Sequence, residues 1–217
     1  EPYTGIRSML IRPNAAIQFA VPAKSDIKSV QDFRGKRLLL GRAGFGCEQQ
    51  SSTILAALDI TDYKSINLGH DDSLAAIVAG NGDVYSNSGA FPHPSFMEMA
   101  ETVSGGIRII GFTEEEIAKI FEKAPFFKAR EMGPVYKGMT EGVLVPEVES
   151  LIAARVDVPE EIVYCITKSF WENREFAEMQ WAGFKTLKLE DVVEITGSAP
   201  WHLGAYKYYK EKGLDIP

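Results

Sequence analysis

The chain has 217 residues and a formal net charge of −7 at pH 7. Hydrophobic residues make up 45% and charged residues 24%, which is typical of a globular protein, and the length allows one large domain or two small lobes. The acidic balance argues against nucleic acid or an anionic membrane surface as the main partner. No apolar run reaches the roughly 20 residues that a membrane span needs.

The first elements in chain order alternate between strand and helix patterns. The apolar run Ala15–Val21, ended by Pro22, predicts a strand. A short helical turn is expected over Ser29–Gly35, a strand over Lys36–Gly41 and a helix over Glu48–Asp59. This order is typical of strand–helix–strand units.

The alternation continues through the middle of the chain. Thr113, with Glu116 three residues later, forms a capping box that opens a helix to about Lys123. Asp71 or Asp72 is the expected N-cap of an earlier helix. The other expected elements are the strands Ser65–Leu68, Gly82–Asn87 and Ile107–Phe112 and the helices Asp72–Ala79 and Pro94–Val103. Together these elements predict a mostly parallel, doubly wound sheet.

The last part of the chain has a different pattern. Gly142–Ala154 predicts a long return strand, and Asp157 and Pro159 open a helix with Ile162, Ile166 and Phe170 on one face. The segments that follow are a polar connection over Glu172–Glu178, a short helix near Leu189–Ile195, and a helix over Leu203–Lys212 that is stopped by Gly213.

A glycine-rich loop follows the strand at Lys36–Gly41. A strand that passes through glycines into a helix points free backbone N–H groups at one spot, which suits a phosphate or a carboxylate. The spacing matches neither a nucleotide P-loop nor the dinucleotide fingerprint. Two interpretations remain, a small-anion site and a plain strand-to-helix turn. The candidate residues are Gly44, Phe45, Gly46 and Cys47.

Five segments of the chain carry motifs that occur together in one family. They are Val30–Leu40, Gly80–Gly89 with Pro92, Pro125–Tyr136, Leu151–Phe170, and the closing stretch Ala199–Leu214 (APWHLGAYKYYKEKGL). In this order they resemble the TAXI-type solute-binding proteins of TRAP transporters. The resemblance spans nearly the whole chain. One departure is the loop, where the family's Gly-Ser-Gly-Thr is replaced by Gly44-Phe45-Gly46-Cys47.

The resemblance implies a bilobed α/β fold of the periplasmic-binding-protein type II kind, with a mostly parallel sheet flanked by helices. The lobe with the anion loop is expected over residues 23–136. Residues 1–22 and 137–217 would supply the hinge strands and the C-terminal helices of the other lobe. Family members carry a further segment before the position of Glu1, and the chain has neither an initiator Met nor a signal peptide there. We therefore expect a fragment with an incomplete first lobe, or a shortened relative.

Ligands of such folds sit in the cleft, at the carboxyl ends of the strands. Besides the loop, the candidates are Ser86, Asn87 and Ser88, which follow a strand and could instead form a hydroxyl-rich turn, with Gly89 and Phe91 next to them. In the family a tyrosine near the position of Tyr136 lies close to the ligand, so Tyr136 is included, with a role as a wall residue as its alternative.

Histidine and cysteine residues predict no metal or cofactor. His70, His93 and His202 lack metal-ligand spacing, and His202 is expected to fix the closing turn by hydrogen bonds. Cys47 at a helix N-terminus is either a small cleft-lining residue or a reactive thiol. Cys165 lies far from it in sequence.

The resemblance implies an extracytoplasmic, periplasmic solute-binding subunit that is not an enzyme. It would capture a small carboxylate, an organic acid or an amino acid, and deliver it to the membrane subunits of a TRAP transporter. Two alternatives remain, an effector-sensing domain of a transcription regulator and a Cys47-dependent enzyme. We expect no nucleic-acid partner, and we expect self-association through uncovered C-terminal helices.

Overall fold

The computed structural model describes residues 4–180, 182–194 and 199–216. The chain forms two compact units, of which unit 1 comprises residues 1–14 and 149–217, and unit 2 comprises Ala15–Val148. The lobe that was predicted over residues 23–136 lies inside unit 2. The two strands that carry the chain from one unit into the other are β1 (Ile6–Pro22) and β7 (Val143–Arg155).

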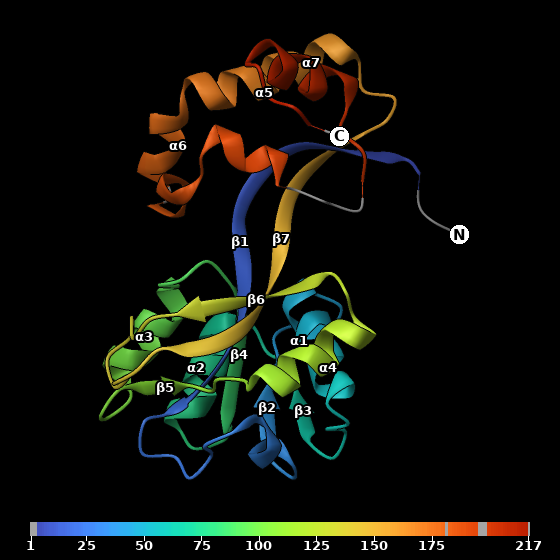
Figure 1. Cartoon of the computed structure of the whole chain (residues 1–217). Coiled ribbons are helices and arrows are strands. Elements are labelled where there is room, and N and C mark those ends of the chain that lie inside the picture. Colours follow the sequence, from blue (N-terminus) through green and yellow to red (C-terminus); the bar gives the residue numbers. More distant parts are fainter. Residues whose placement is uncertain (1–3, 181, 195–198, 217) are drawn as a thin grey trace. The chain divides into compact units, whose positions relative to one another are not determined.

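The strands form one seven-stranded sheet with the order β3-β2-β4-β1-β7-β6, and β5 pairs with β1 (Figure 1). The remaining strands are β2 (Arg37–Leu39), β3 (Lys64–Ile66), β4 (Val84–Gly89), β5 (Ile107–Ile109) and β6 (Phe127–Met132). Pairing is parallel between β2 and β3 and between β2 and β4, but antiparallel for β1 with β4 and β5 and for β6 with β7. The sheet is therefore mixed, whereas the sequence pattern predicted a mostly parallel one.

Helices cover both faces of the sheet in unit 2 (Figure 1). Their bounds are η1 (Val30–Phe33), α1 (Gly46–Ala57), α2 (His70–Val78), α3 (Pro94–Thr102) and α4 (Glu114–Lys123). Buried residues of α1 and α4 pack on one face, and buried residues of α2 and α3 pack on the other. The expected α/β class with a sheet flanked by helices is confirmed.

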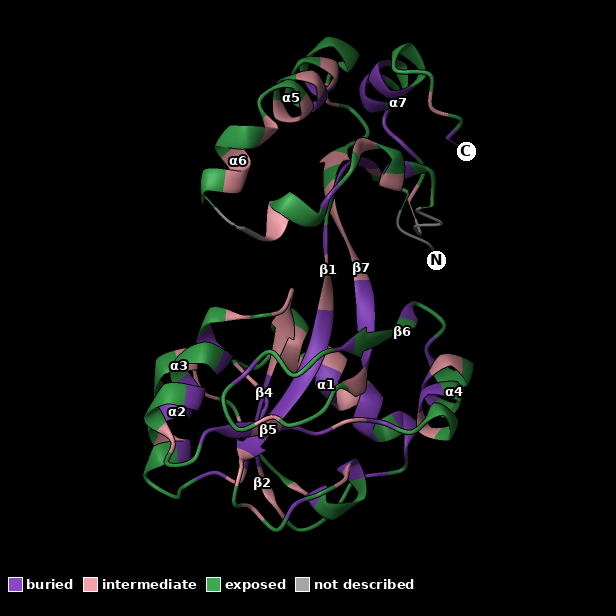
Figure 2. Cartoon of the chain, turned by 60° about the vertical axis from the view of Figure 1, so that its left-hand side comes forward, coloured by how far each residue is buried: buried purple, intermediate pink, exposed green. Residues whose placement is uncertain are grey.

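The middle of the sheet is buried on both sides, as the colours along β1 in unit 2 show (Figure 2). Because side chains alternate along a strand, Ile17 and Phe19 join the core under α1 and α4. Ala16 and Ala20 join the core under α2 and α3. The two faces of unit 2 therefore have separate apolar cores around the same central strand.

Unit 1 is built from helices packed on the outer parts of β1 and β7. They are α5 (Glu160–Glu172), α6 (Arg174–Gln180), η2 (Ala182–Thr186), η3 (Leu189–Val193) and α7 (Leu203–Glu211). Helices α5 and α7 pack tightly together, because a Cβ on Gly204 would lie 2.2 Å from the carbonyl oxygen of Glu160. The polar connection predicted over residues 172–178 is wrong, since α6 forms there. Part of the helix predicted near residues 189–195 is found in η3, and residue 195 lies outside the described residues.

The apolar residues that the periodicity placed on one face of α5 are not the residues that this helix buries. The helix buries Val163 and Thr167, while Ile162 and Ile166 are 51% and 44% exposed. Phe170 packs at the edge of the core of unit 1. The exposure of the two isoleucines agrees with the expectation of an uncovered face.

One predicted helix N-cap is confirmed and another is wrong. Thr113 and Glu116 form the predicted capping box, with bonds of 2.9 Å and 3.2 Å. The predicted Asp71 or Asp72 cap of α2 is wrong, because Gly69 is the N-cap and both acids lie inside the first turn. Acidic side chains are also favourable inside a first turn, so sequence alone did not separate the two placements.

Candidate functional site

The candidate residues lie in unit 2, at one edge of the sheet. Strand β2 runs parallel to β4, so the loop that follows β2 and the end of β4 lie at the same edge. In open α/β sheets this carboxyl edge is where ligands bind. Helix α1 begins directly after the loop, at Gly46.

The loop after β2 needs glycine at two positions. Gly41 and Gly44 have φ values of +92° and +79°, which side-chain-bearing residues rarely adopt. Between them the chain makes a turn, with the Phe45 N–H donating to the Arg42 carbonyl at 3.1 Å. The Gly44 N–H donates to Glu48 Oε2 at 3.3 Å. The N–H of Phe45, a predicted ligand donor, is therefore already used within the loop.

Of the three N–H groups predicted to bind the ligand, those of Gly46 and Cys47 at the start of α1 remain uncommitted. No side chain caps this helix at its N-cap Phe45, a residue that is itself 62% exposed. Among the described residues, the N–H groups of Gly46 and Cys47 donate to no acceptor. Such first-turn donors, together with the helix dipole, favour an anion. The predicted donor set of this loop is thus reduced to these two groups.

Hydroxyl groups from β4 lie beside the start of α1. Ser86 Oγ is 2.7 Å from Ser51 Oγ and 3.9 Å from Cys47 Sγ. Burial raises the pKa of the Cys47 thiol, and hydrogen bonds with Ser86, Ser51 and Ser88 offset only part of this effect. An activated nucleophile needs a lowered pKa. The environment of Cys47 therefore favours the protonated thiol over an activated nucleophile.

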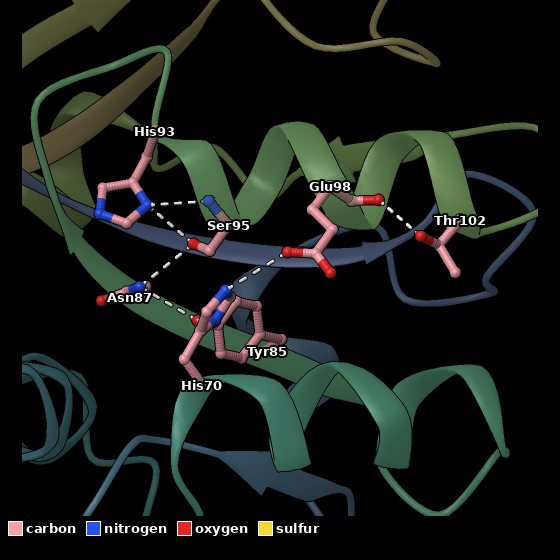
Figure 3. A network of polar contacts seen from close by, with 7 residues as sticks. All are labelled: His70, Tyr85, Asn87, His93, Ser95, Glu98 and Thr102. Atoms are coloured by element: carbon pink, nitrogen blue, oxygen red, sulfur yellow. Dashed lines mark hydrogen bonds and ion pairs between the residues drawn. The ribbon is translucent and has the colours of Figure 1, made fainter.

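Asn87 connects β4 to the opposite face of the sheet (Figure 3). Its Oδ1 accepts a hydrogen bond from the Ser88 N–H at 2.8 Å, which fixes the orientation of the side-chain amide group. Nδ2 donates to the Tyr85 hydroxyl at 3.0 Å and to Ser95 Oγ at 3.1 Å. The Tyr85 hydroxyl is also 2.6 Å from His70 Nδ1. Burial raises the pKa of Tyr85 to about 12, so this phenol stays protonated.

His93 caps α3 and closes the network. Its Nδ1 accepts from the Ser95 N–H at 3.3 Å and lies 2.7 Å from Ser95 Oγ. Burial, with a smaller contribution from His70, lowers the pKa of His93 below its usual value. A neutral imidazole with the proton on Nε2 fits this cap, because Nδ1 must accept.

Tyr136 has a buried structural position. Its hydroxyl donates to Gln18 Oε1 at 2.7 Å and accepts from the His93 N–H at 2.8 Å. Burial raises its pKa to about 12. These bonds support its alternative role as a wall residue.

Gly89 and Phe91 shape the same end of β4. A Cβ on Gly89 would lie 2.5 Å from the His93 ring, so any larger residue there would have to displace that ring. The Phe91–Pro92 bond is cis, and the Arg130 guanidinium lies 5.8 Å from the centre of the Phe91 ring.

The structure brings Cys47, Ser86 and Ser88 together on the α1 side and places Asn87 and Tyr136 on the other side. Sequence reasoning did not select four further residues, namely Ser51, His70, Tyr85 and Ser95. Only Ser51 had a readable signal, because it follows Cys47 by four residues and so shares its helix face. His202 does fix the closing turn as predicted, accepting from the Gly204 N–H at 3.2 Å.

The described residues contain no cluster of three or more His, Cys, Asp or Glu side chains that could hold a metal ion. Within the same part of the chain, no helix is both long and apolar enough to cross a membrane.

Comparison with known protein families identifies the family of this chain. A sequence model of the NMT1-like family matches residues 1–213. The chain belongs to the NMT1-like family. This family assignment spans both units described above.

Several solved structures are similar to this NMT1-like chain. A periplasmic binding protein of an ABC transporter from Brucella ovis, with glutathione bound, is 12% identical over 75% of this chain and 40% of its own, with a TM-score of 0.47. A putative periplasmic sulfonate-binding protein, SsuA, from Methylobacillus flagellatus KT is 17% identical over 87% of this chain and 44% of its own, with a TM-score of 0.42. An ancestral arginine-binding protein bound to glutamine is 15% identical over 83% and 60%, with a TM-score of 0.45. The chain therefore spans 40% to 60% of the length of these proteins.

Proposed function

We propose that this chain is the solute-binding part of an extracytoplasmic subunit of a TRAP-type transporter, and that it captures a small carboxylate, an organic acid or an amino acid. The observation that carries the proposal is the pair of uncommitted N–H groups of Gly46 and Cys47 at the start of α1. The hydroxyl of Ser86 lies 3.9 Å from the Cys47 thiol sulfur. The ordered motifs shared with TAXI-type proteins, together with membership of the NMT1-like family, support the transporter context.

The carboxylate would lie at the start of α1 and accept hydrogen bonds from Gly46 and Cys47. Donors at a helix N-terminus bind a negative charge without a basic side chain. The protonated thiol and the serine hydroxyls beside them would complete a polar wall for the neutral part of the solute. The proposed role requires binding only, and no group near the loop has to change its charge.

Gly46→Pro tests this site with little disturbance of the fold. Gly46 is the first residue of α1, a position that tolerates proline, and Phe45 before it has φ −85° and ψ 156°, the extended conformation that a following proline favours. A Cβ at Gly46 meets nothing within 4 Å. The substitution therefore removes one N–H donor and leaves the helix start intact.

We expect isothermal titration with a panel of organic acids and amino acids to identify at least one that binds. Gly46→Pro should weaken this binding about tenfold to a hundredfold, the usual effect of a lost hydrogen bond to a charged group. Gly46→Ala keeps the N–H and is the matched control, with an affinity close to that of the unchanged chain. Equal affinity of the proline and alanine variants would reject the assignment.

A further inference from the structure

The side chain of His93 lies at the end of β4, next to the residues that line the proposed α1 site. A Cβ on Gly89, the last residue of β4, would lie 2.5 Å from His93 Cδ2 and 3.0 Å from His93 Nε2. The imidazole therefore lies against the Gly89 backbone. Ser88, the residue before Gly89, forms hydrogen bonds with Cys47. The imidazole and the α1 site thus contact adjacent residues of β4, whose Cα atoms are about 3.8 Å apart.

Three contacts hold the His93 ring in place. Its Nδ1 accepts from the Ser95 N–H at 3.3 Å and lies 2.7 Å from Ser95 Oγ. The ring packs edge-on against Phe96, with 5.9 Å between the ring centres. The backbone N–H of His93 donates to the Tyr136 hydroxyl at 2.8 Å. The ring cannot turn without losing these contacts, so the position of Nε2 is fixed.

The same network determines which ring nitrogen carries the proton. Ser95 Oγ accepts a hydrogen from Asn87 Nδ2 at 3.1 Å, so the Ser95 hydroxyl hydrogen is directed to His93 Nδ1. Burial lowers the pKa of His93, which favours the neutral imidazole. The one ring proton is therefore on Nε2, the nitrogen that is turned away from Ser95 (Figure 3).

The Nε2–H group of His93 is a donor that no described residue accepts. It is also open to solvent. Among the described residues, the fully buried side-chain nitrogen and oxygen atoms that lack a partner belong to Gln50, Ser73 and Arg108. His93 Nε2 is not one of these atoms, so an acceptor from outside the protein can reach it.

The other histidine of the network differs in this respect. Glu98 Oε2 lies 3.9 Å from His70 Nε2, so a carboxylate of the protein already faces that imidazole. No acidic side chain in the described part of the chain forms an ion pair with His93, and the charged group that affects its pKa is His70. His93 is therefore the histidine of the network that is available to a ligand.

We propose that the Nε2–H group of His93 is a second contact of the solute, and that it selects acids with a hydroxyl or carbonyl oxygen at the end remote from the carboxylate. This inference rests on the proposed function and narrows the class of solute. A neutral N–H donor suits an oxygen acceptor, whereas an ammonium group carries only donors. A hydroxy acid or an oxo acid should therefore bind in preference to an amino acid.

Matched acids of equal length test this selection by isothermal titration. One set is propionate, β-hydroxypropionate and β-alanine, and the other is butyrate, γ-hydroxybutyrate and γ-aminobutyrate. In at least one set the hydroxy acid should bind about threefold to tenfold more tightly than the acid that ends in a methyl group, which is the usual effect of one neutral hydrogen bond. It should also bind more tightly than the amino acid of the same set.

NMR on the isotope-labelled full chain separates the two contacts without any substitution. The backbone amide signals of Gly46 and Cys47 report binding of the carboxylate at α1. The ring signals of His93 report the second contact. All acids that bind should shift the first group of signals in a saturable way, and the hydroxy acid should shift the His93 ring signals more than its methyl counterpart.

A substitution at His93 tests the donor itself. His93→Asn keeps a favourable capping side chain, but this side chain ends before the position of Nε2. The hydroxy acid should then bind no more tightly than the methyl acid of the same length. The matched control is His202→Asn, which makes the same change at the histidine that caps α7 in unit 1. It should leave the preference for the hydroxy acid unchanged.

The outcomes distinguish this inference from the proposed function. The second contact is rejected, and the proposed function stands, if the Gly46 and Cys47 signals respond but the hydroxy acids gain nothing over the methyl acids. A preference that persists in His93→Asn, or tighter binding of the amino acids, has the same meaning. If no acid shifts the Gly46 and Cys47 signals, the proposed function fails, and the inference fails with it.

Discussion

At the scale of single residues, His93 makes the stability of unit 2 depend on pH. Its Nδ1 caps α3 only while it is unprotonated, because it accepts from the Ser95 N–H. Burial lowers the pKa of His93 in the folded chain below its usual value of about 6.5. The unfolded chain therefore binds a proton at this residue more readily than the folded chain does.

The sign of the pH effect follows directly. Above about pH 6.5 the imidazole is neutral in both states, and its full contribution to the free energy of unfolding is present. As the pH falls from there through the folded pKa, that contribution is lost. We expect denaturant titrations to show a steeper loss of stability on acidification for the natural chain than for His93→Asn, which keeps a capping side chain but does not titrate. Parallel curves for the two proteins would contradict this role of His93.

At the scale of secondary structure elements, the contact between α5 and α7 depends on one glycine. A Cβ on Gly204 would meet the Glu160 carbonyl oxygen at 2.2 Å and the Tyr164 nitrogen at 2.6 Å. Both neighbours are backbone atoms and cannot turn aside. The two helices would have to separate to admit even a methyl group.

Gly204→Ala should therefore lower the free energy of unfolding by about 1–3 kcal/mol, the usual cost of overpacking. Helix propensity alone predicts the opposite sign, since alanine is the better helix former. Gly46→Ala is the matched control at a helix start with open space around it, and it should change stability little. Chemical denaturation of both variants measures the difference, and an unchanged or higher stability of Gly204→Ala would show that the helices adjust freely.

The sequence allowed elements with strong local signals to be predicted. The Thr113 and Glu116 capping box depends on residues three apart, so it could be read without the fold. Strand β6 was missed because its four inner residues are exposed and mostly polar, which removes the apolar alternation. Strand β1 is longer than predicted, since Arg12 and Asn14 interrupt its apolar run. Both misses reflect tertiary pairing that outweighs local pattern.

The candidate site was only partly predictable, for a related reason. The glycine loop is continuous in sequence and was found. His70, Tyr85 and Ser95 come from α2, β4 and α3, and only the packing of these three elements on one face brings them together.

At the scale of the whole molecule, we expect the chain to self-associate through unit 1. The side chains of Ile162 and Ile166 on α5 and of Phe176 and Met179 on α6 are exposed, and α6 buries none of its residues. Burying such apolar surface between two copies is favourable.

Sedimentation should show an average mass that rises with concentration. The double variant Ile162→Ser with Ile166→Ser should reduce this rise. The control is Val78→Ser with Met97→Ser, which changes two exposed apolar residues of unit 2 and should leave association unchanged. A monomer at all concentrations for the natural chain would contradict the expectation.

The alternation of side chains along β4 has a consequence for how this protein can change. Ser86 and Ser88 belong to the α1 side, whereas Tyr85 and Asn87 belong to the network with α2 and α3. Adjacent residues of β4 therefore contact two separate parts of the molecule. Substitutions at positions 86 and 88 would alter the wall of the proposed α1 site while the hydrogen bonds of Tyr85 and Asn87 stay intact, and substitutions at 85 and 87 would alter those hydrogen bonds and leave the wall unchanged. Paired mutations drawn from the two sets should have nearly additive effects, so the solute preference of the proposed site could change in small independent steps.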